Sequence, residues 1–444
     1  MTDFASILGF EPNTDQRKAL VQLTQFIKSN KDVFILKGSA GTGKTSIIKA
    51  ITSHLVKEDI SFKIGAPTGR AAMIIGNKTV QKSRTIHSHL YIPEKLKNGG
   101  GVRLLRKINQ EQRLTVYLID EASMVSNTLS KSEYFFVGQP LLTDLIDFVK
   151  QGNANNKVVF IGDRFQLPPV NENFSPALSK KYLTEQMSLK VEEYELTKVM
   201  RQSEHSSVLH IATQLRNTME GAVNETKASI NREPRSSDAL KKYLACFDAQ
   251  KLDNIVAICP TNRDVDFWNT WVRQKLGLGN SLLSASDFVV SQNTWLNNTG
   301  DWVFRGEFGR VKSLEKNIEK FAELHFLNAI IEFPTSSGSM KEIKTKVLLE
   351  SLYTRYGQLE EEQEKHLYAQ VMKKNPKFRA SQKNADDEYL GAIRLRHAYA
   401  TTCHKAQGGE WDNVLVHPWL VGRDLQWTYT AVTRARHQVF TYAA

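Results

Sequence analysis

Short runs of apolar and β-branched residues, each followed by a helix-like stretch, recur through the first two hundred residues. Four of these runs are predicted to be buried strands: Val33–Lys37, Ser61–Ala66, Thr115–Ile119 and Lys157–Ile161. Strands buried on both faces are typical of a parallel sheet. Each run ends in a cluster rich in Gly, Pro, Thr or Asp, and open α/β sheets bind their ligands at that end of the strands. The pattern therefore predicts an α/β domain with a site along one sheet edge.

The same alternation restarts after Glu195. Four more strands and one helix are predicted, the strands at Ile255–Ile258, Arg394–Tyr399, Asn413–His417 and Gln438–Tyr442 and the helix at Asp264–Leu276. The restart indicates a second α/β domain, and the long gap between its first and last strands indicates an insertion.

Three segments break this rhythm. Ser88–Gln112 carries Asn98-Gly99-Gly100-Gly101 between apolar flanks, which predicts a protruding hairpin. Phe288–Val311 has the pattern of short strands with glycine turns. Lys346–Lys373 is predicted to be helical, with the acidic run Glu360–Glu364 on a solvated face.

Composition narrows the class of protein. The 444 residues include 59 Lys and Arg against 47 Asp and Glu, a formal net charge of +12, and their 41% hydrophobic content excludes global disorder. Three cysteines are too few and too scattered for a disulfide framework or a zinc site, which favours a reducing compartment. The N-terminus lacks a signal-peptide pattern, and the apolar runs are too short to span a bilayer. We therefore expect a soluble, cytoplasmic protein, and its basic charge suggests a polyanionic partner.

A phosphate-binding motif follows the first predicted strand. Residues 38–45 fit G-x-x-x-x-G-K-[ST] and lead into a helix-permissive stretch. In that context the glycines let backbone N–H groups approach phosphates, and the helix N-terminus favours their negative charge. Lys44 is expected to reach the β- and γ-phosphates, and the Thr45 hydroxyl to coordinate Mg²⁺. The predicted nucleotide-binding residues are Gly38, Ser39, Ala40, Gly41, Thr42, Gly43, Lys44, Thr45 and Ser46.

A second motif supplies the acids that such a site needs. The apolar run Val116–Ile119 ends in Asp120 and Glu121. Asp120 is assigned to the Mg²⁺ shell, and Glu121 to orienting or deprotonating the attacking water. With the phosphate-binding loop, these acids predict a Mg²⁺-dependent nucleoside triphosphatase.

Seven segments, in order along the chain, resemble the helicase motifs of superfamily 1. They are Ala66–Ala72, Thr85–His87, Asp120–Met124, Gly162–Val170, Leu196–Arg201, Ala400–Gly408 and Tyr429–Arg436. Their order and spacing look most similar to the RecD-like and phage Dda-like branch, over residues 11–201, 255–270 and 398–440.

The resemblance implies an α/β fold with two RecA-like parallel-sheet motor domains. The first is expected to carry a small β-hairpin insertion, or pin, and the second a β-rich, SH3-like insertion with helices. The predicted ranges are 1–87 and 113–190 for the first domain, 88–112 for the hairpin, 191–280 and 393–444 for the second domain, and 281–392 for its insertion.

The resemblance also implies roles around the nucleotide. Gln16 stands where the family has its adenine-reading glutamine, and Gln407 is assigned to the nucleotide site. Gln166 would sense the γ-phosphate, with a satisfied loop amide as the alternative. Arg201 and Arg434 would act from the second domain as arginine fingers on the γ-phosphate, with surface ion pairs as the alternative. Arg436 could equally pair within its own domain.

Single-stranded DNA is expected along the top of the two sheets. Hydroxyl, amide and cationic groups suit phosphate contacts, which position a strand without reading its sequence. A structural role for each residue is the alternative, including a buried, hydrogen-bonded ring for each histidine. The predicted DNA-binding residues are Thr68, Arg70, Thr85, His87, Asn262, Thr402, His404 and Lys405.

The leading hypothesis is an ATP-dependent DNA helicase that translocates 5′ to 3′ on single-stranded DNA and separates duplex DNA. A nucleic-acid-stimulated ATPase that remodels complexes without unwinding is the alternative, and an RNA-directed motor is a third hypothesis. The expected cofactors are ATP and Mg²⁺. The expected partners of this monomer are single-stranded DNA, fork DNA, and replication or repair proteins, with no membrane.

Overall fold

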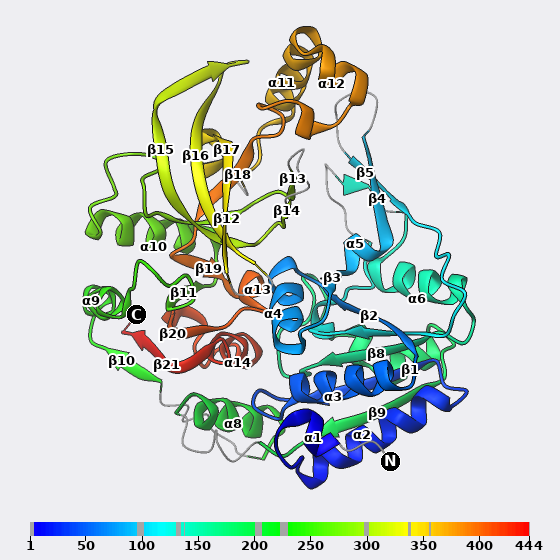
Figure 1. Ribbon diagram of the computed structural model, residues 1–444. Helices are drawn as coiled ribbons and strands as arrows, with labels where there is room; N and C mark the ends of the chain where they lie inside the picture. Colours follow the sequence, from blue (N-terminus) through cyan, green and yellow to red (C-terminus); the bar gives the residue numbers. More distant parts are fainter. Residues whose placement is uncertain are drawn as a thin grey trace.

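The molecule is built on two α/β domains, each with a parallel sheet, and a barrel, a pair of helices and a hairpin project from these domains (Figure 1). The computed structural model describes residues 4–95, 102–129, 135–136, 138–199, 207–222, 230–296, 302–335, 339–354 and 357–443. Within these ranges, every helix is too short or too polar to cross a membrane.

The first domain contains six parallel strands, β1 (Val33–Gly38), β2 (Ser61–Ala66), β3 (Ser83–Thr85), β6 (Thr115–Ile119), β8 (Lys157–Gly162) and β9 (Val191–Leu196). Their order is β3-β2-β6-β8-β1-β9. One face is covered by α1 (Phe4–Leu8), α2 (Thr14–Lys28), α3 (Lys44–Lys57) and α4 (Gly69–Thr79), and the other by α5 (Ile86–Leu90), α6 (Leu141–Gly152) and α7 (Lys180–Glu185).

Side chains of the central strands alternate between these two faces. In β1, Phe34 and Leu36 pack into the core beneath α1 to α4, whereas Val33 and Ile35 pack into the core beneath α5 to α7. Successive residues of a strand point to opposite faces of the sheet, so a strand buried on both faces is apolar throughout. This explains why β1, β2, β6 and β8 could be predicted from short apolar runs, whereas the polar edge strands β3 and β9 were not predicted.

The second domain contains five parallel strands in the order β10-β21-β20-β11-β19. The strands are β10 (Asn231–Glu233), β11 (Ile255–Cys259), β19 (Ala400–Thr402), β20 (Trp411–Val416) and β21 (Ala435–Tyr442). Its helices are α8 (Ser207–Met219), α9 (Ser236–Cys246), α10 (Asn262–Lys275), α13 (Cys403–Ala406) and α14 (Leu425–Val432). The prediction of two parallel-sheet α/β domains is confirmed.

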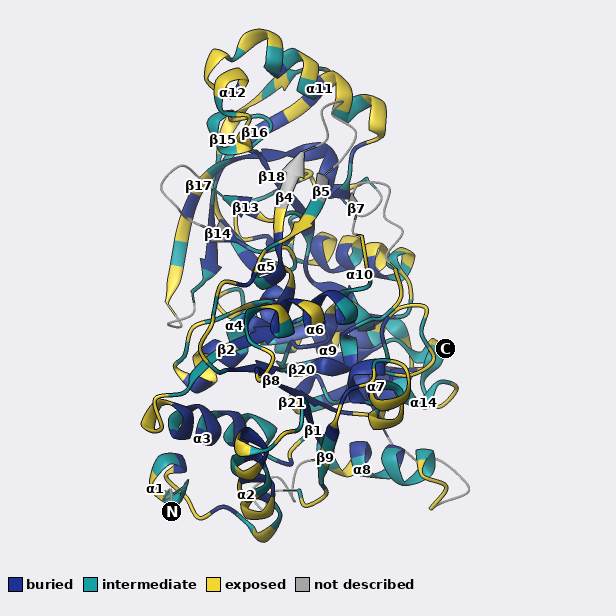
Figure 2. Ribbon diagram, turned by 90° about the vertical axis from the view of Figure 1, so that its right-hand side faces the viewer, coloured by how far each residue is buried: buried dark blue, intermediate teal, exposed yellow. Residues whose placement is uncertain are grey.

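The insertion in the second domain is a closed five-stranded barrel, as expected of an SH3-like module. Its strands are β12 (Phe288–Ser291), β15 (Phe308–Phe321), β16 (Leu324–Pro334), β17 (Met340–Leu348) and β18 (Ile393–His397). A short pair, β13 (Trp295–Leu296) and β14 (Trp302–Val303), lies beside it, and α11 (Glu361–Lys374) and α12 (Pro376–Ser381) extend from its end. Buried residues concentrate in the strands of the sheets and the barrel, whereas α11 and α12 expose much of their surface (Figure 2).

The predicted hairpin is present in the first domain. β4 (Tyr91–Lys95) pairs antiparallel with β5 (Val102–Arg106), and the two-residue strand β7 (Phe135–Phe136) adds to β5. The predicted turn at Asn98–Gly101 lies outside the described residues.

Two strands lie in a different unit from the one predicted. The predicted boundary at residue 190 assigns Val191–Leu196 to the second domain, but β9 pairs with β1 in the first sheet. Arg394–Tyr399 is predicted as a strand of the second sheet, but β18 instead closes the barrel between β12 and β17. An apolar run predicts a strand but does not specify its hydrogen-bond partner, which is decided by tertiary pairing.

The helix predicted at Lys346–Lys373 also begins too early. Its first residues complete β17, where Lys346 pairs with Asn328, and the helix α11 begins only at Glu361. At the start of this helix the Glu360 side chain accepts the backbone N–H of Gln363, and the Gln363 side-chain oxygen accepts the backbone N–H of Glu360. This capping box explains where the helix starts.

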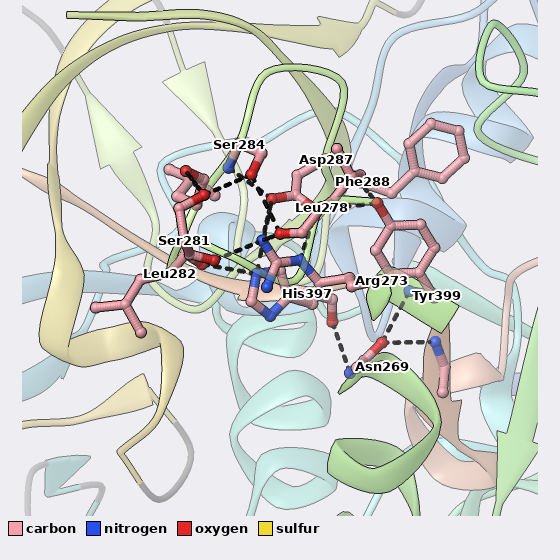
Figure 3. A network of polar contacts seen from close by, with 12 residues as sticks. Asn269, Arg273, Leu278, Ser281, Leu282, Ser284, Asp287, Phe288, His397 and Tyr399 are labelled. Carbon is pink, nitrogen blue, oxygen red and sulfur yellow. Dashed lines mark hydrogen bonds and ion pairs between the residues drawn. The ribbon is translucent and has the colours of Figure 1, made fainter. Parts of the chain in front are cut away.

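A buried polar network joins the barrel to the second domain (Figure 3). Arg273 of α10 makes two hydrogen bonds of 2.8 Å to the carboxylate of Asp287, which also accepts one from the Tyr399 hydroxyl at 3.0 Å. Asn269 accepts the N–H groups of Tyr399 and Ala400. Because the chain enters the barrel after Asp287 and leaves it before Tyr399, the network holds both crossings together.

Candidate nucleotide and nucleic-acid sites

The phosphate-binding loop connects β1 to α3, as its motif predicts. Gly41 and Gly43 have φ angles of 80° and 88°, in the left-handed region that glycine adopts without strain. The loop thereby turns its backbone toward the N-terminus of α3, an arrangement that attracts anions. Lys44 Nζ donates to the carbonyl oxygens of Gly38 at 2.7 Å and Ser39 at 3.1 Å, so the ammonium group lies over the loop.

Asp120 and Glu121 lie at the carboxyl end of β6, beside this loop. Burial and the neighbouring Glu121 charge raise the pKa of Asp120 to about 7, and Lys44 opposes that rise. Glu121 has φ 50° and ψ 39° although it is not glycine. Such backbone strain costs on the order of 1–3 kcal/mol and clusters at functional sites. A tight turn retains it, with the Met124 N–H donating to the Glu121 carbonyl at 3.1 Å.

These residues fit a bound nucleotide and a divalent cation. The Thr45 hydroxyl and the Asp120 carboxylate are oxygen ligands of the kind that Mg²⁺ prefers. Among the described residues, no group of three or more His, Cys, Asp or Glu side chains could hold a metal ion. A cation at this place would therefore take further oxygens from phosphate and water, as Mg²⁺ usually does in nucleotide sites.

Gln16 lies against the loop from α2. Its Nε2 donates to the Thr42 carbonyl at 3.3 Å, and its Oε1 accepts the Asn13 N–H at 3.1 Å within a capping box. The structure thus brings the predicted adenine-reading residue to the nucleotide side of the sheet, where the same amide also closes the start of α2.

Gln166 lies in a buried loop that continues from β8, residues 163–167. The Asp163 carboxylate accepts the Phe165 N–H at 3.0 Å, and the Gln166 N–H donates to the Asp163 carbonyl at 3.3 Å. The Gln166 Oε1 is buried and has no hydrogen-bond partner within the described part of the chain. An orphaned buried acceptor is costly and calls for a donor. The alternative of a satisfied loop amide therefore does not describe Gln166, but Oε1 needs a donor and a phosphate oxygen is an acceptor, so the γ-phosphate role stays a prediction.

The second domain presents arginines to these groups. Arg434 is 4% exposed, its Nε donates to the Thr430 carbonyl at 3.0 Å, and its Nη1 lies 4.0 Å from Glu121 Oε1 across the interface. Arg436 pairs instead with Asp253 at 2.6 Å and Asp412 at 3.2 Å. The alternative for Arg436, pairing within its own domain, therefore describes it. Arg201, the other predicted finger, lies outside the described residues.

Three interface residues were not predicted from the sequence. Tyr429 and Thr430 contact the loop 163–167, and Arg216 Nη1 donates to the Ser39 hydroxyl at 2.6 Å. Tyr429 and Thr430 lie inside the helicase-like segment Tyr429–Arg436, so their contacts could have been sought among the polar residues of that segment. Arg216 lies in a stretch without any motif, and only the packing of α8 reveals it.

Gln407 does not lie where its predicted nucleotide role requires. Its Nε2 donates to the Leu167 carbonyl at 2.9 Å, and the side chain is buried. The amide is therefore bound to the loop 163–167 rather than directed at the phosphate-binding loop, because the turn after α13 packs against that loop.

The predicted DNA-binding residues lie at the carboxyl ends of four strands. Thr68 follows β2, Thr85 ends β3, Asn262 follows β11 and Thr402 ends β19. The Thr68 and Thr85 hydroxyls cap α4 and α5 by accepting N–H bonds, and each hydroxyl keeps a hydrogen to donate. The four residues thus lie at the carboxyl-terminal edge of the two sheets, two on each.

The remaining candidates flank this edge. His87 is exposed after β3, whereas His404 is half-buried beside Thr402. Desolvation, together with Arg396 and Arg305, lowers the pKa of Lys405 to about 8, so this group stays mostly charged at neutral pH. Lys405 is exposed, as a phosphate contact requires.

Arg70 is the exception. Its guanidinium carbon lies 3.8 Å from the ring centre of Trp411 and 4.4 Å from that of Phe308, and Nη2 donates to the Glu410 carbonyl. The side chain is buried between the first domain, the second domain and the barrel. The prediction that Arg70 contacts DNA is wrong for this structure. A guanidinium binds aromatic faces well, and here it is stacked on two rings and buried instead of being exposed to a phosphate.

Two family models match the chain, "AAA domain" over residues 11–231 and "UvrD-like helicase C-terminal domain" over residues 397–442. Together they match more than half of its length. The chain is 24% identical over 286 residues to the ATP-dependent DNA helicase dda of enterobacteria phage T4, covering 62% of this chain and 59% of that protein. It is 22% identical over 425 residues to the ATP-dependent RecD2 DNA helicase of Deinococcus radiodurans, covering 92% and 46%.

The fold has solved counterparts as well. The chain matches a crystal structure of Bacteroides Pif1 with a TM-score of 0.53 and 18% identity, covering 97% of this chain and 92% of that one. It spans less than two thirds of the length of the curated relatives named above. Motif order, family models and fold agree, and the chain belongs to the superfamily 1 helicase family, in its RecD-, Pif1- and Dda-like branch.

Proposed function

We propose that this protein is an ATP-dependent DNA helicase that moves along single-stranded DNA and separates duplexes. One observation carries the proposal: the groups for ATP hydrolysis are divided between two domains. Lys44, Asp120 and Glu121 lie on the first, and Arg434 faces Glu121 from the second at 4.0 Å. Hydrolysis then depends on how the domains sit, so each cycle can move them.

The residues have distinct tasks. The loop amides and Lys44 bind the phosphates, while Thr45 and Asp120 hold the Mg²⁺ that neutralises charge on the transferred phosphoryl group. Glu121 orients the attacking water and accepts its proton. Arg434 stabilises the negative charge that develops at the γ-phosphate, with Arg201 as a second finger. Gln166, in the loop 163–167, senses the γ-phosphate.

DNA is the proposed polymer because the relatives are DNA helicases and the matched Bacteroides Pif1 structure is a complex with single-stranded DNA. The edge formed by Thr68, Thr85, Asn262 and Thr402 supplies neutral phosphate contacts, and Lys405 a cationic one. We propose 5′-to-3′ movement from the likeness to the RecD- and Dda-like branch. We further propose a cytoplasmic monomer that works with replication or repair proteins, consistent with three unpaired thiols.

The hairpin β4–β5 favours strand separation over remodelling without unwinding. Its two strands pair from Tyr91–Arg106 to Lys95–Val102 and project from the first domain (Figure 1). Lys107 at its base donates to the Ser88 carbonyl, which fixes the hairpin to the domain. A projection of this kind can block the second strand at a fork, whereas a motor that only pulls one strand has no need of one.

A paired assay tests this function. ATP turnover is measured without nucleic acid, with single-stranded DNA and with RNA, and the DNA-stimulated rate is expected to be highest. Unwinding is then measured on duplexes with a 5′ or a 3′ single-stranded tail, and only the 5′-tailed substrate is expected to open. Stimulation without unwinding supports the remodelling ATPase, stimulation by RNA alone supports the RNA motor, and unwinding of only 3′-tailed duplexes contradicts the polarity.

A further inference from the structure

Three side chains of the second domain make hydrogen bonds to the loop 163–167. The Tyr429 hydroxyl donates to Asp163 Oδ2 at 2.6 Å. The Thr430 hydroxyl accepts the Leu167 N–H at 2.8 Å, and Gln407 Nε2 donates to the Leu167 carbonyl at 2.9 Å. Both ends of the loop that carries Gln166 are thus bonded to the opposite domain, while Arg164 between them pairs with Glu195 of the first domain at 2.8 Å.

Tyr429 makes a second bond that the other two do not. Its hydroxyl oxygen accepts the N–H of Ala40 at 3.2 Å. Ala40 is the third residue of the phosphate-binding loop, and the N–H groups of this loop are what bind phosphate. One hydroxyl therefore connects the phosphate-binding loop, the loop 163–167 and the second domain.

The environment makes this hydroxyl a dependable donor. Tyr429 and Asp163 are both buried, and burial together with the Asp163 charge raises the pKa of Tyr429 well above its usual value. The hydroxyl stays protonated and keeps donating to Asp163. Arg216 reaches the adjacent residue, Ser39, so the second domain contacts two successive residues of the phosphate-binding loop.

We propose that Tyr429 is a positioning residue that reports phosphate occupancy to the loop 163–167. The inference rests on the proposed function, because it concerns how ATP controls the grip on DNA. A backbone N–H has one hydrogen to give. A phosphate oxygen at Ala40 competes with the Tyr429 hydroxyl for that hydrogen, and the hydroxyl then retains Asp163 alone.

This exchange alters the interface next to Gln166. The orphaned Gln166 Oε1 lies three residues beyond Asp163, in the segment whose two ends the second domain holds. Loss of the Ala40 bond removes one of the contacts between the second domain and the phosphate-binding loop, while the Arg216–Ser39 bond and the bonds to the loop 163–167 remain. The contact at Ala40 can then change while the bonds to Asp163 and Leu167, on either side of Gln166, persist, and this rearrangement couples nucleotide state to DNA affinity.

The test removes one hydroxyl with Tyr429→Phe. The matched control is Tyr243→Phe, because Tyr243 is equally buried in the second domain and donates to the Tyr399 carbonyl at 2.9 Å, away from the interface. Binding of a fluorescent single-stranded oligonucleotide is measured with ADP and with a non-hydrolysable ATP analogue. The ratio of the two dissociation constants reports the coupling between the sites.

In Tyr429→Phe this ratio is expected to fall to within about twofold of one, while Tyr243→Phe keeps the wild-type ratio. DNA-stimulated kcat is expected to fall about tenfold with little change in KM for ATP. A wild-type ratio in Tyr429→Phe, or an equal loss in Tyr243→Phe, overturns the inference. Wild-type protein whose ATPase ignores DNA contradicts the proposed function instead.

A second variant covers the case in which Tyr429→Phe fails to fold. Asp163→Asn replaces one carboxylate oxygen with an amide NH2 group, so a single oxygen is left for the Phe165 N–H and the Tyr429 hydroxyl, and the same bond is weakened from the first domain. It is expected to reduce the ratio as Tyr429→Phe does. In the double variant the two losses should not add, because both act through one hydrogen bond. Additive losses, or a wild-type ratio in Asp163→Asn, contradict the inference.

Discussion

The two α/β domains touch in two places that differ in kind. In the phosphate-side contact, Tyr429, Thr430, Gln407 and Arg216 make hydrogen bonds to the first domain, and Arg434 faces Glu121. In the Arg70 contact, a guanidinium is stacked between two rings, and the exposed pair Lys78–Glu410 lies beside it.

The difference lies in what each contact can exchange. Hydrogen bonds have directions, and a phosphate oxygen can replace the Tyr429 hydroxyl as the acceptor of the Ala40 N–H in the phosphate-side contact. Stacking of a cation on ring faces is less directional. In the Arg70 contact, Arg70 Nη1 and Trp411 Nε1 are buried without partners within the described residues. The phosphate-side contact is therefore suited to respond to nucleotide, and the Arg70 contact to hold the domains together meanwhile.

The largest effect is expected at the phosphate-side contact from Lys44→Ala. Removing the ammonium group should reduce ATP turnover to the background rate, a fall of at least about 10³-fold, because no other group neutralises the phosphates from within the loop. Stability should change little, since Lys44 bonds loop carbonyls rather than the core. Phosphate release and thermal unfolding measure the two effects. Appreciable turnover would contradict the assignment of the nucleotide site.

Arg434→Ala is expected to lower kcat by about 10²-fold while nucleotide affinity changes far less, since the guanidinium acts mainly on transition-state charge. Arg436→Ala is the matched control, because its guanidinium pairs with Asp253 and Asp412. The control should keep nearly wild-type turnover. If kcat and nucleotide affinity fall together in Arg434→Ala, Arg434 serves as a structural partner of an ion pair, and its proposed role in stabilising charge at the γ-phosphate is refuted.

Arg70→Ala probes the other contact. Loss of the stacked guanidinium is expected to destabilise the protein by about 2 kcal/mol, measured by denaturant unfolding. Affinity for single-stranded DNA should change by less than about threefold, because phosphate contacts require an accessible cation. Arg113→Ala removes an exposed cation that pairs with Asp59 in the same domain and serves as the control. A selective tenfold loss of DNA affinity in Arg70→Ala would restore the sequence-based interpretation of Arg70.

The smallest effect is expected for Lys78→Ala. The Lys78–Glu410 pair joins the two domains at 3.0 Å, but both side chains are more than one-third exposed. Exposed ion pairs contribute roughly 0–1 kcal/mol. The free energy of unfolding should therefore fall by less than about 1 kcal/mol, and the difference from wild type should vanish at high salt. A larger, salt-insensitive loss would mean that the Arg70 contact depends on charge pairing rather than on stacking.

The sequence predicted the residues whose role is fixed by their neighbours in the chain. Gly41, Gly43 and Lys44 form one side of the site within eight residues, and Asp120 follows a strand that is apolar on both faces. These features need only a local strand, turn and helix, so periodicity and motif spacing suffice.

Residues whose role depends on a distant partner were harder to predict. Arg70 stands in a motif at a strand end, but its direction is decided by Trp411 and Phe308, more than two hundred residues away. β18 is predictable as a strand, yet its place in the barrel is decided by β12 and β17, and the polar β9, not predicted as a strand, joins the first sheet through β1. Arg216 gave no local signal, because an arginine on a helix is ordinarily a solvated residue.

The network around Arg273 and Asp287 makes the barrel a lever. Because the ion pair ties both crossings of the chain, the barrel must rotate as one piece with the sheet of the second domain. β15 runs for 14 residues, and at about 3.3 Å per residue it reaches up to roughly 45 Å from that pivot. A turn of a few degrees at the nucleotide is thereby magnified into a sweep of several ångströms at the far end, where α11 and α12 stand above the hairpin (Figure 1).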